Sequence, residues 1–296
     1  MSDSKWQPIE KKIPVPWGHV AAKFYGPSGE NNILVVHGIL DNAGSFDRLI
    51  DLLPRKYHYV SIDLPGHGFS SPFPTGVPLQ FFDYVYTILL VLNALKWKTC
   101  IYLAHSFGVQ IGVSFSILYP GRLDKIIAID GVMSPPIKDL VSYTQELYNL
   151  DSYSKDTGRL NTKDEVMYAL KFKRGEALNS DAAEATFKRA VTKIDNLYKY
   201  NRDPRLRNYP KPMFTIDQHR EFMLRFQTPM LIILAESSSR HKPLAILARE
   251  LGTLVRGNIP YHVVSVEGNH DVHNNYPERV APIICKFLDN DTKSKL

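Results

Sequence analysis

Ser106 lies in a five-residue motif, AHSFG at 104–108, that suits a nucleophilic serine. The motif is the G-x-S-x-G pattern of a nucleophile elbow with its first glycine replaced by Ala104, and it stands between an apolar run and a helical pattern. In such an elbow a strained turn presents the serine hydroxyl above a sheet, so the flanking positions must be small, and alanine is small. We predict that Ser106 is a nucleophile. The simpler alternative is a serine that only caps the helix.

A serine hydroxyl is a weak nucleophile and needs a base. His270, in the sequence GNH at 268–270, follows the last apolar run of the chain. Serine first and histidine last is the chain order expected with this elbow. The chain has 10 histidines, so position rather than residue type selects His270, with His273 as the alternative.

The negative charge that develops on an attacked carbonyl needs backbone N–H donors. One donor should be the N–H of Phe107, directly after the serine. The other should come from the turn after the apolar run at 33–37, most simply from Ile39, because Gly38 lets the chain bend there.

The acid that would orient the histidine is less clearly marked. The usual place is a G-x-x-D pattern after a late strand, but this chain has AESS at 235–238, with Ser238 where the aspartate is expected. Asp130 ends an earlier apolar run and should reach the same sheet edge as Ser106, so it is our first choice. Glu236 is the alternative acid, and a site without a working acid is the third reading.

Two other aspartates near glycines have different expected roles. Asp63, in DLPGHGFS at 63–70, should accept N–H bonds from its own loop, which is a structural role. Asp41 should lie near the mouth of the site and orient the loop of Ile39.

The elements that must position these residues are short apolar runs that alternate with helical patterns. The runs cover 33–37, 59–63, 100–104, 126–130, 230–235 and 261–266. Nearly continuous apolar strands of this kind are buried on both faces, which predicts an α/β class with a mostly parallel sheet flanked by helices. An antiparallel hairpin is expected at the front, from 11–15 and 19–25 around the turn at 16–18.

One interval, 133–226, breaks this alternation. It has helical patterns without a good strand pattern, and loops above about 15 residues are uncommon. The helical stretches are expected at 140–150, 164–173, 182–200 and 217–226. We therefore predict a core formed by 1–132 and 227–296, with an inserted helical cap at 133–226.

Composition excludes several classes of protein. The 296 residues are 44% hydrophobic and 22% charged, which is ordinary globular usage. Cys100 and Cys285 cannot form a disulfide scaffold, so a reducing compartment is expected. The longest apolar stretch, 85–95, has about half of the roughly 20 residues that span a bilayer, so we expect no membrane span. The N-terminus has no apolar signal-peptide region.

The net charge is +6, and the segment 188–211 holds eight basic and two acidic residues. Such a segment attracts anions, but most basic runs are solvated helix surface. No nucleic-acid-binding motif accompanies it, so we expect no nucleic-acid partner.

Taken together, these motifs resemble the α/β-hydrolase superfamily with a helical cap. More narrowly, the chain is similar to the serine hydrolase-like proteins, which are peroxisome-associated. The local matches are PWGH at 16–19, LDNA at 40–43, SFDRL at 45–49, LKW at 95–97, HSFG at 105–108, NRD at 201–203 and GNHDVH at 268–273. The resemblance implies a serine hydrolase that uses Ser106, with a poorly defined natural substrate.

The sequence ends in Ser294-Lys295-Leu296, the tripeptide of a peroxisomal import signal. We expect the peroxisomal import receptor as a partner and the peroxisome matrix as the location, with the cytoplasm as a second location.

These observations favour a serine esterase or thioesterase. Ser106 would attack an acyl carbonyl, His270 would take its proton, and Asp130 or Glu236 would hold the imidazole. No metal or organic cofactor is implied. The alternative function is a catalytically weak or non-catalytic member of the fold that binds a small ligand, because the aspartate is missing at its usual place.

Overall fold

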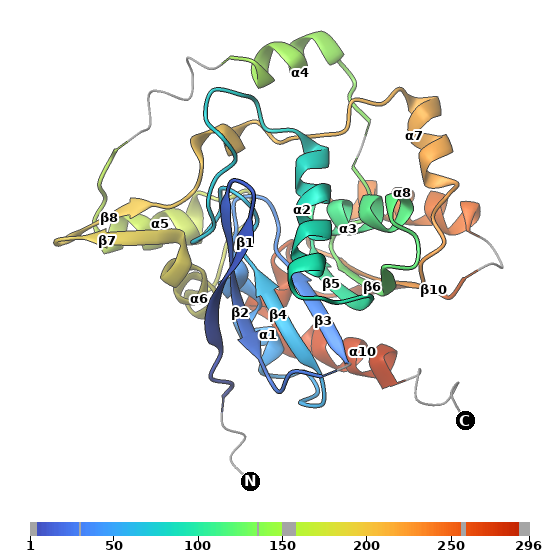
Figure 1. Ribbon diagram of the computed structural model, residues 1–296, viewed down its shortest axis with the longest axis horizontal. Coiled ribbons are helices and arrows are strands. Elements are labelled where there is room, and N and C mark those ends of the chain that lie inside the picture. Colours follow the sequence, from blue (N-terminus) through green and yellow to red (C-terminus); the bar gives the residue numbers. More distant parts are fainter. Residues whose placement is uncertain (1–4, 30, 135, 150–157, 256–258, 290–296) are drawn as a thin grey trace.

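The computed structural model describes residues 5–29, 31–134, 136–149, 158–255 and 259–289. Within these ranges, eight strands form the central sheet in the order β1-β2-β4-β3-β5-β6-β9-β10 (Figure 1). The strands are β1 (Ile9–Val15), β2 (Gly18–Tyr25), β3 (Asn32–Val36), β4 (His58–Ile62), β5 (Cys100–His105), β6 (Leu123–Ile129), β9 (Met230–Ala235) and β10 (Tyr261–Val266). Strand β2 pairs antiparallel with β1 and β4, and the other neighbours are parallel. The predicted α/β class and mostly parallel sheet are confirmed.

The predicted hairpin at the front of the chain is also confirmed. Val15 pairs with Gly18, so a two-residue turn joins β1 to β2. Gly18 has a φ of 143°, and a Cβ there would lie 2.3 Å from the Ser71 hydroxyl oxygen. Only glycine fits this turn without displacing the loop that follows β4.

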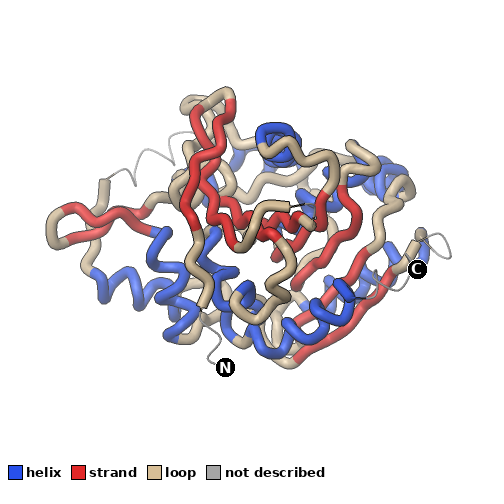
Figure 2. The backbone as a smooth tube through the Cα atoms, turned by 60° about the horizontal axis from the view of Figure 1, so that its bottom comes forward, coloured by secondary structure: helices blue, strands red, loops and turns tan. Residues whose placement is uncertain are grey.

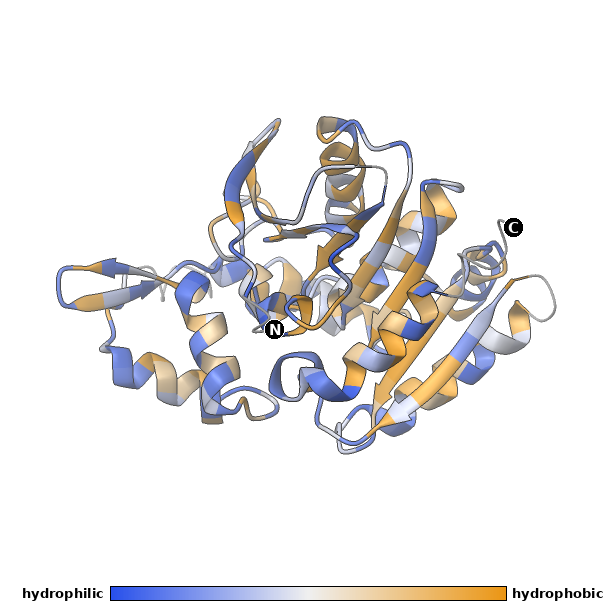
Figure 3. Cartoon of the chain, turned by 90° about the horizontal axis from the view of Figure 1, so that it is seen from below, coloured by the Kyte–Doolittle hydropathy of each residue, from blue (hydrophilic) through white to orange (hydrophobic). Residues whose placement is uncertain are grey.

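Helices cover both faces of the sheet because successive strand residues point to opposite sides. Leu34 and Val36 of β3 belong to the hydrophobic cluster that holds the buried faces of α2, α3 and α8. Ile33 and Val35 belong to the cluster with α1, α9 and α10. The helices are α1 (Asp47–Ile50), α2 (Phe81–Ala94), α3 (Phe107–Leu118), α8 (His241–Leu254), α9 (Val272–Asn275) and α10 (Pro277–Asp289). The apolar interior between these layers is visible in Figure 3.

The interval between β6 and β9 contains both helices and a hairpin. Its elements are α4 (Leu140–Leu147), α5 (Lys163–Phe172), α6 (Ser180–Ala190), β7 (Val191–Ile194), β8 (Leu197–Tyr200) and α7 (Ile216–Met223). The prediction of one helix over 182–200, and of no strand in this interval, is wrong. The helix ends at Ala190, and the chain turns back at Asp195, whose φ is 52°. Figure 2 shows this hairpin extending away from the central sheet.

The inserted segment, as we call residues 133–226, packs on the loop between β3 and α1. The Asn42 amide nitrogen donates to the Thr186 carbonyl at 3.0 Å. Arg189 of α6 is buried and forms an ion pair with Asp63, with 2.6 Å between Nη2 and Oδ2. Asp63 also accepts N–H bonds from its surroundings, so its predicted structural role is confirmed. The exact division of the chain into core and cap stays a prediction.

Part of the basic segment 188–211 is not solvated surface, which corrects that expectation. Arg189 and Arg205 are both buried, and Arg205 pairs with Asp203 at 2.6 Å. The Arg205 guanidinium also donates to three backbone carbonyls, those of Phe73, Pro74 and Val77.

No helix in the described ranges is both long enough and apolar enough to cross a bilayer.

Candidate active site

Ser106 occupies a strained turn between β5 and α3. Its φ of 50° and ψ of −112° lie outside the regions that most residues adopt. Two glycines make room for this turn. A Cβ on Gly108 would lie 2.5 Å from the Val36 carbonyl oxygen, and a Cβ on Gly131 would lie 2.8 Å from the backbone carbonyl oxygen of Ser106. Ser106 stands at the N-cap position of α3, but its side chain makes no capping bond. The simple helix-capping alternative is therefore wrong.

Three predicted residues meet in one hydrogen-bonded chain. His270 Nε2 lies 2.9 Å from Ser106 Oγ. His270 Nδ1 lies 2.5 Å from Asp130 Oδ2. Asp130 Oδ1 accepts the N–H of Ala235 at 2.9 Å, which fixes the carboxylate against the end of β9. The distances give the histidine a donor side toward Asp130 and an acceptor side toward Ser106.

The carboxyl group of Asp130 is buried and ionised. Burial, the largest single effect, would raise its pKa, whereas the hydrogen bond and charge of His270 lower it. Donors from Ala235 and Ser238 act in the same direction, so the pKa of Asp130 falls below its ordinary value. Ser238, which replaces the expected aspartate, thus stabilises the charge of the acid on the neighbouring strand.

Glu236, the alternative acid, lies elsewhere. Its side chain is exposed, and its backbone N–H donates to Val266. None of the described hydrogen bonds joins its carboxylate to His270. The geometry therefore favours Asp130 over Glu236.

The two predicted oxyanion donors border the serine. Among the described contacts, neither the Ile39 N–H nor the Phe107 N–H has a hydrogen-bond partner. Gly38 approaches the elbow so closely that a Cβ there would lie 3.2 Å from the Ser106 Cβ. His37 holds this turn, because its Nδ1 lies 2.7 Å from the Gly38 carbonyl oxygen and its Nε2 accepts the Leu64 N–H. Burial lowers the pKa of His37 to about 3, so the ring is neutral.

His273, the alternative base, is fully buried beneath the site. Its ring stacks on His105 with centroids 4.2 Å apart. Burial lowers the pKa of His273 well below its ordinary value and that of His105 to about 3. Asp41 completes a group whose metal-ligating atoms lie within 4.8 Å of one another. Because Arg174 already neutralises Asp41 at 3.4 Å and the two rings stack, these residues suit packing rather than a metal site.

Sequence reasoning missed Arg240. Its Nη1 lies 3.4 Å from Ser106 Oγ and 3.3 Å from His270 Nε2. Arg240 follows β9 in the same loop as Glu236 and Ser238, so its place beside a candidate acid is the sequence signal for it.

Glu176, from the inserted segment, was also missed. One of its carboxylate oxygens accepts the backbone N–H of His270 at 2.5 Å. The other accepts the backbone N–H and the hydroxyl of Ser239 at 2.7 and 2.8 Å. No sequence motif marks this residue. It joins the loop of the histidine to the loop of Arg240.

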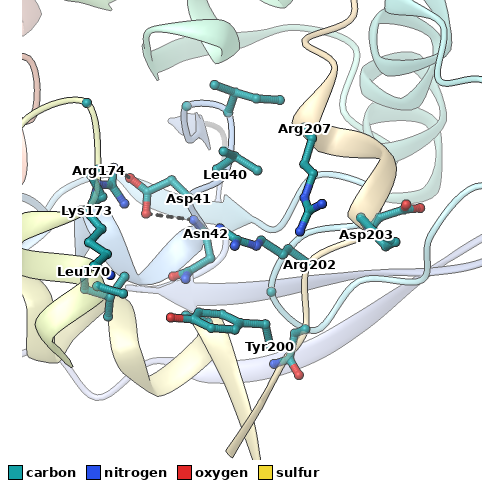
Figure 4. A pocket seen from close by; sticks show the side chains of 18 of the residues that line it. Leu40, Asp41, Asn42, Leu170, Lys173, Arg174, Tyr200, Arg202, Asp203 and Arg207 are labelled. Atoms are coloured by element: carbon teal, nitrogen blue, oxygen red, sulfur yellow. Dashed lines mark hydrogen bonds and ion pairs between the residues drawn. The ribbon is translucent and has the colours of Figure 1, made fainter. Parts of the chain in front are cut away.

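Ser106 and His270 face a cavity of about 1480 Å³. Its walls come from the loop after β3, the elbow, and the segment from α5 to the turn after β8. In the view of Figure 4, Leu40 to Asn42 lie between Lys173 and Arg174 on one side and Arg202 and Arg207 on the other. A cavity of this size holds a substrate larger than a simple short ester.

Comparison with known proteins places this geometry in a family. Residues 31–243 match the family described as the alpha/beta hydrolase fold. A "Serine hydrolase-like protein 2" of Homo sapiens is 32% identical, with 94% of this chain and 93% of the relative covered. A "Serine hydrolase-like protein" of Mus musculus is 30% identical over 94% and 95%. The crystal structure of a hypothetical protein from Pseudomonas aeruginosa PAO1 has a TM-score of 0.78 at 25% identity, covering 95% of this chain and 99% of that one.

The chain is thus a hydrolase of the α/β-hydrolase fold. Within that class it belongs to the serine hydrolase-like proteins.

Proposed function

We propose that this hydrolase cleaves a carboxylic ester or thioester through an acyl-enzyme on Ser106. The observation that supports the proposal is the continuous chain of hydrogen bonds from Asp130 through His270 to Ser106. It supports a working acid although Ser238 stands at the usual acid position, because Asp130 reaches the histidine from the neighbouring strand.

The proposed reaction begins when the Ser106 oxygen attacks the acyl carbonyl. His270 Nε2 takes the hydroxyl proton, and Asp130 stabilises the resulting imidazolium at Nδ1. The N–H groups of Ile39 and Phe107 donate to the oxyanion. His270 then gives the proton to the leaving alcohol or thiol, and the C–O or C–S bond breaks. A water molecule, deprotonated by His270, then attacks the acyl carbon; the bond from Ser106 Oγ to the acyl group breaks, His270 returns the proton to Oγ, and the carboxylic acid leaves.

Labelling with a fluorophosphonate probe tests the proposal, because the probe reacts only with an activated serine. We expect one labelled residue, Ser106, and hydrolysis of a 4-nitrophenyl ester that Ser106→Ala abolishes. Ser116→Ala, on the same helix, is the control and should keep both activities. Circular dichroism and thermal unfolding would establish that Ser106→Ala is folded.

A folded wild-type protein that neither takes the probe nor hydrolyses activated esters would contradict the proposal. That result would favour the alternative of a ligand-binding protein without catalysis.

A further inference from the structure

The cavity above Ser106 carries an excess of positive charge. Among the described residues that line it, eight are Lys or Arg and five are Asp or Glu. The cations are Arg159, Lys173, Arg174, Lys199, Arg202, Arg205, Arg207 and Arg240. The carboxylates are Asp41, Glu165, Glu176, Asp203 and Asp271.

Three of these carboxylates form ion pairs with two arginines that line the cavity. Arg174 lies 3.4 Å from Asp41 and 3.0 Å from Asp271, and all three side chains are mostly buried. Arg205 forms an ion pair with Asp203. These two cations are therefore held by carboxylates and are not free to bind a ligand, and Arg174 is shared between two of them.

The remaining two carboxylates are bound by N–H and hydroxyl donors. Glu165 closes the capping box of α5, where it accepts the Thr162 N–H at 2.8 Å. Glu176 accepts the three donors of His270 and Ser239 described above. Glu165 also lies 3.7 Å from Arg159, so it pairs with one of the eight cations, and none of the described ion pairs joins Glu176 to a cation of the cavity.

Three of the cations that the inserted segment contributes to the cavity lack a carboxylate contact within the described part of the chain. Lys173 lies over the Tyr168 ring and Arg202 over the Tyr200 ring, 5.7 and 4.8 Å from the centroids. Lys199 lies on β8, next to Tyr200. In Figure 4, Lys173 and Arg202 border the same space.

Arg240 is the fourth such cation, and it lies at the reacting atoms. Its guanidinium contacts Ser106 Oγ and His270 Nε2, neither of which is a carboxylate. A bound substrate would displace water from this guanidinium. A neutral substrate would leave the charge without a partner, which is unfavourable, whereas an anionic group would restore one.

We propose that the cavity takes esters or thioesters that carry an oxyanion group, a carboxylate or a phosphate. This inference rests on the proposed function, since it names the substrate class of the same site. Arg240 would bind an anion close to the scissile carbonyl, where its planar guanidinium suits a carboxylate or phosphate edge. Lys199 and Arg202 would bind an anion farther along the substrate.

Two matched substrate pairs distinguish the position of the anion. 4-Nitrophenyl hemiglutarate against 4-nitrophenyl butyrate places a carboxylate on the acyl side. Butyryl-coenzyme A against S-butyryl-N-acetylcysteamine places phosphates on the leaving group. In at least one pair, kcat/KM of the anionic substrate should exceed that of the neutral one by about tenfold, and the ratio should fall as salt is added.

Charge-removing variants then identify the cations. Arg240→Gln should lower the anionic-to-neutral ratio by about tenfold, and the double variant Lys199→Gln with Arg202→Gln by about fivefold, because these two lie farther from the scissile carbonyl. Lys193→Gln is the matched control, since Lys193 is exposed on the same hairpin but does not line the cavity. Arg240→Lys should recover part of the loss.

A preference in either pair that these variants reduce supports the inference. Equal kcat/KM within both pairs, or equal responses of both members to the variants, would overturn it. If hydrolysis is too slow to measure, the assay becomes the rate at which the fluorophosphonate labels Ser106, and glutarate or pyrophosphate should slow this labelling. Protection by neither anion would likewise overturn the inference. Failure of the proposed function is separate, because Ser106 would then not take the probe at all.

Discussion

Replacing Asp130 by Asn tests how the acid controls the histidine. Asn has nearly the same size, and its oxygen can keep the N–H bond from Ala235 that Asp130 Oδ1 now accepts. The amide NH2 then faces His270 Nδ1, at the position where Asp130 Oδ2 now lies 2.5 Å away. Because an NH2 group donates, Nδ1 must give up its proton, and the proton moves to Nε2. In that tautomer the ring cannot accept the proton of Ser106.

The expected loss in kcat is on the order of 10⁴, as found when a triad histidine is held in the wrong tautomer. This corresponds to about 5 kcal/mol of activation free energy. The assay is kcat on a 4-nitrophenyl ester, with urea unfolding to show that the fold persists. Glu236→Gln is the matched control, because its exposed side chain makes none of the described contacts with His270, and it should stay within about twofold of wild type.

A loss below tenfold for Asp130→Asn in a folded protein would refute the assignment of the acid. Equal losses in the two variants would refute the argument from geometry, because only one of the two carboxylates touches the histidine.

Three further outcomes are expected. Glu176→Gln should lower kcat on the 4-nitrophenyl ester by about tenfold, because a neutral amide holds the loops of the histidine and Arg240 less firmly; unchanged kcat would argue against this positioning role. Burial raises the pKa of Asp41 to about 6, so at about pH 5 the folded protein holds a proton on this carboxyl group that the unfolded chain has lost. This group therefore makes the free energy of unfolding about 1 kcal/mol larger at about pH 5 than at about pH 7. Urea unfolding at both pH values should show that Asp41→Asn lacks this gain, and an identical pH response would contradict it. The import tripeptide lies outside the described residues; deleting 294–296 should leave the protein diffuse in the cytosol by microscopy, and retained peroxisomal co-localisation would contradict that prediction.

The elbow and the parallel sheet could be predicted because their signals are local. A buried parallel strand needs a nearly continuous apolar run, and the serine follows one of these runs directly. The turn allows little choice at Gly108, so its glycine is visible in the sequence. These features depend on neighbouring residues and need no knowledge of distant contacts.

The sequence ranks Asp130 before Glu236 but does not decide between them, because the two candidates lie at the ends of neighbouring strands. β6 pairs with β9, so Asp130 and Glu236 reach the same edge of the sheet. Only the direction of each side chain decides, and that depends on packing. Arg240 and Glu176 were missed for a related reason, since their partners are 30 or more residues away.

The hairpin of the inserted segment was missed although its signal was present. Val191, Thr192 and Ile194 are β-branched, and Tyr198 and Tyr200 are aromatic, which favours strands. The Asp195-Asn196 pair suits a tight hairpin turn. The charged residues of this stretch also fit one face of a helix, so the sequence pattern predicts a helical period where the strand period of two residues applies.

The buried ion pair of Asp63 and Arg189 has a consequence for how the substrate range of this lineage can evolve. Asp63 follows β4, whereas Arg189 belongs to the inserted segment, and losing Arg189 would leave Asp63 as a buried charge without its cation. A recombined segment would therefore have to supply a cation at the position of Arg189, or Asp63 would have to change in the same event. Single substitutions on the cavity wall, at Lys199 for example, carry no such penalty. New specificities in this lineage should arise by point changes in the wall rather than by exchange of the segment.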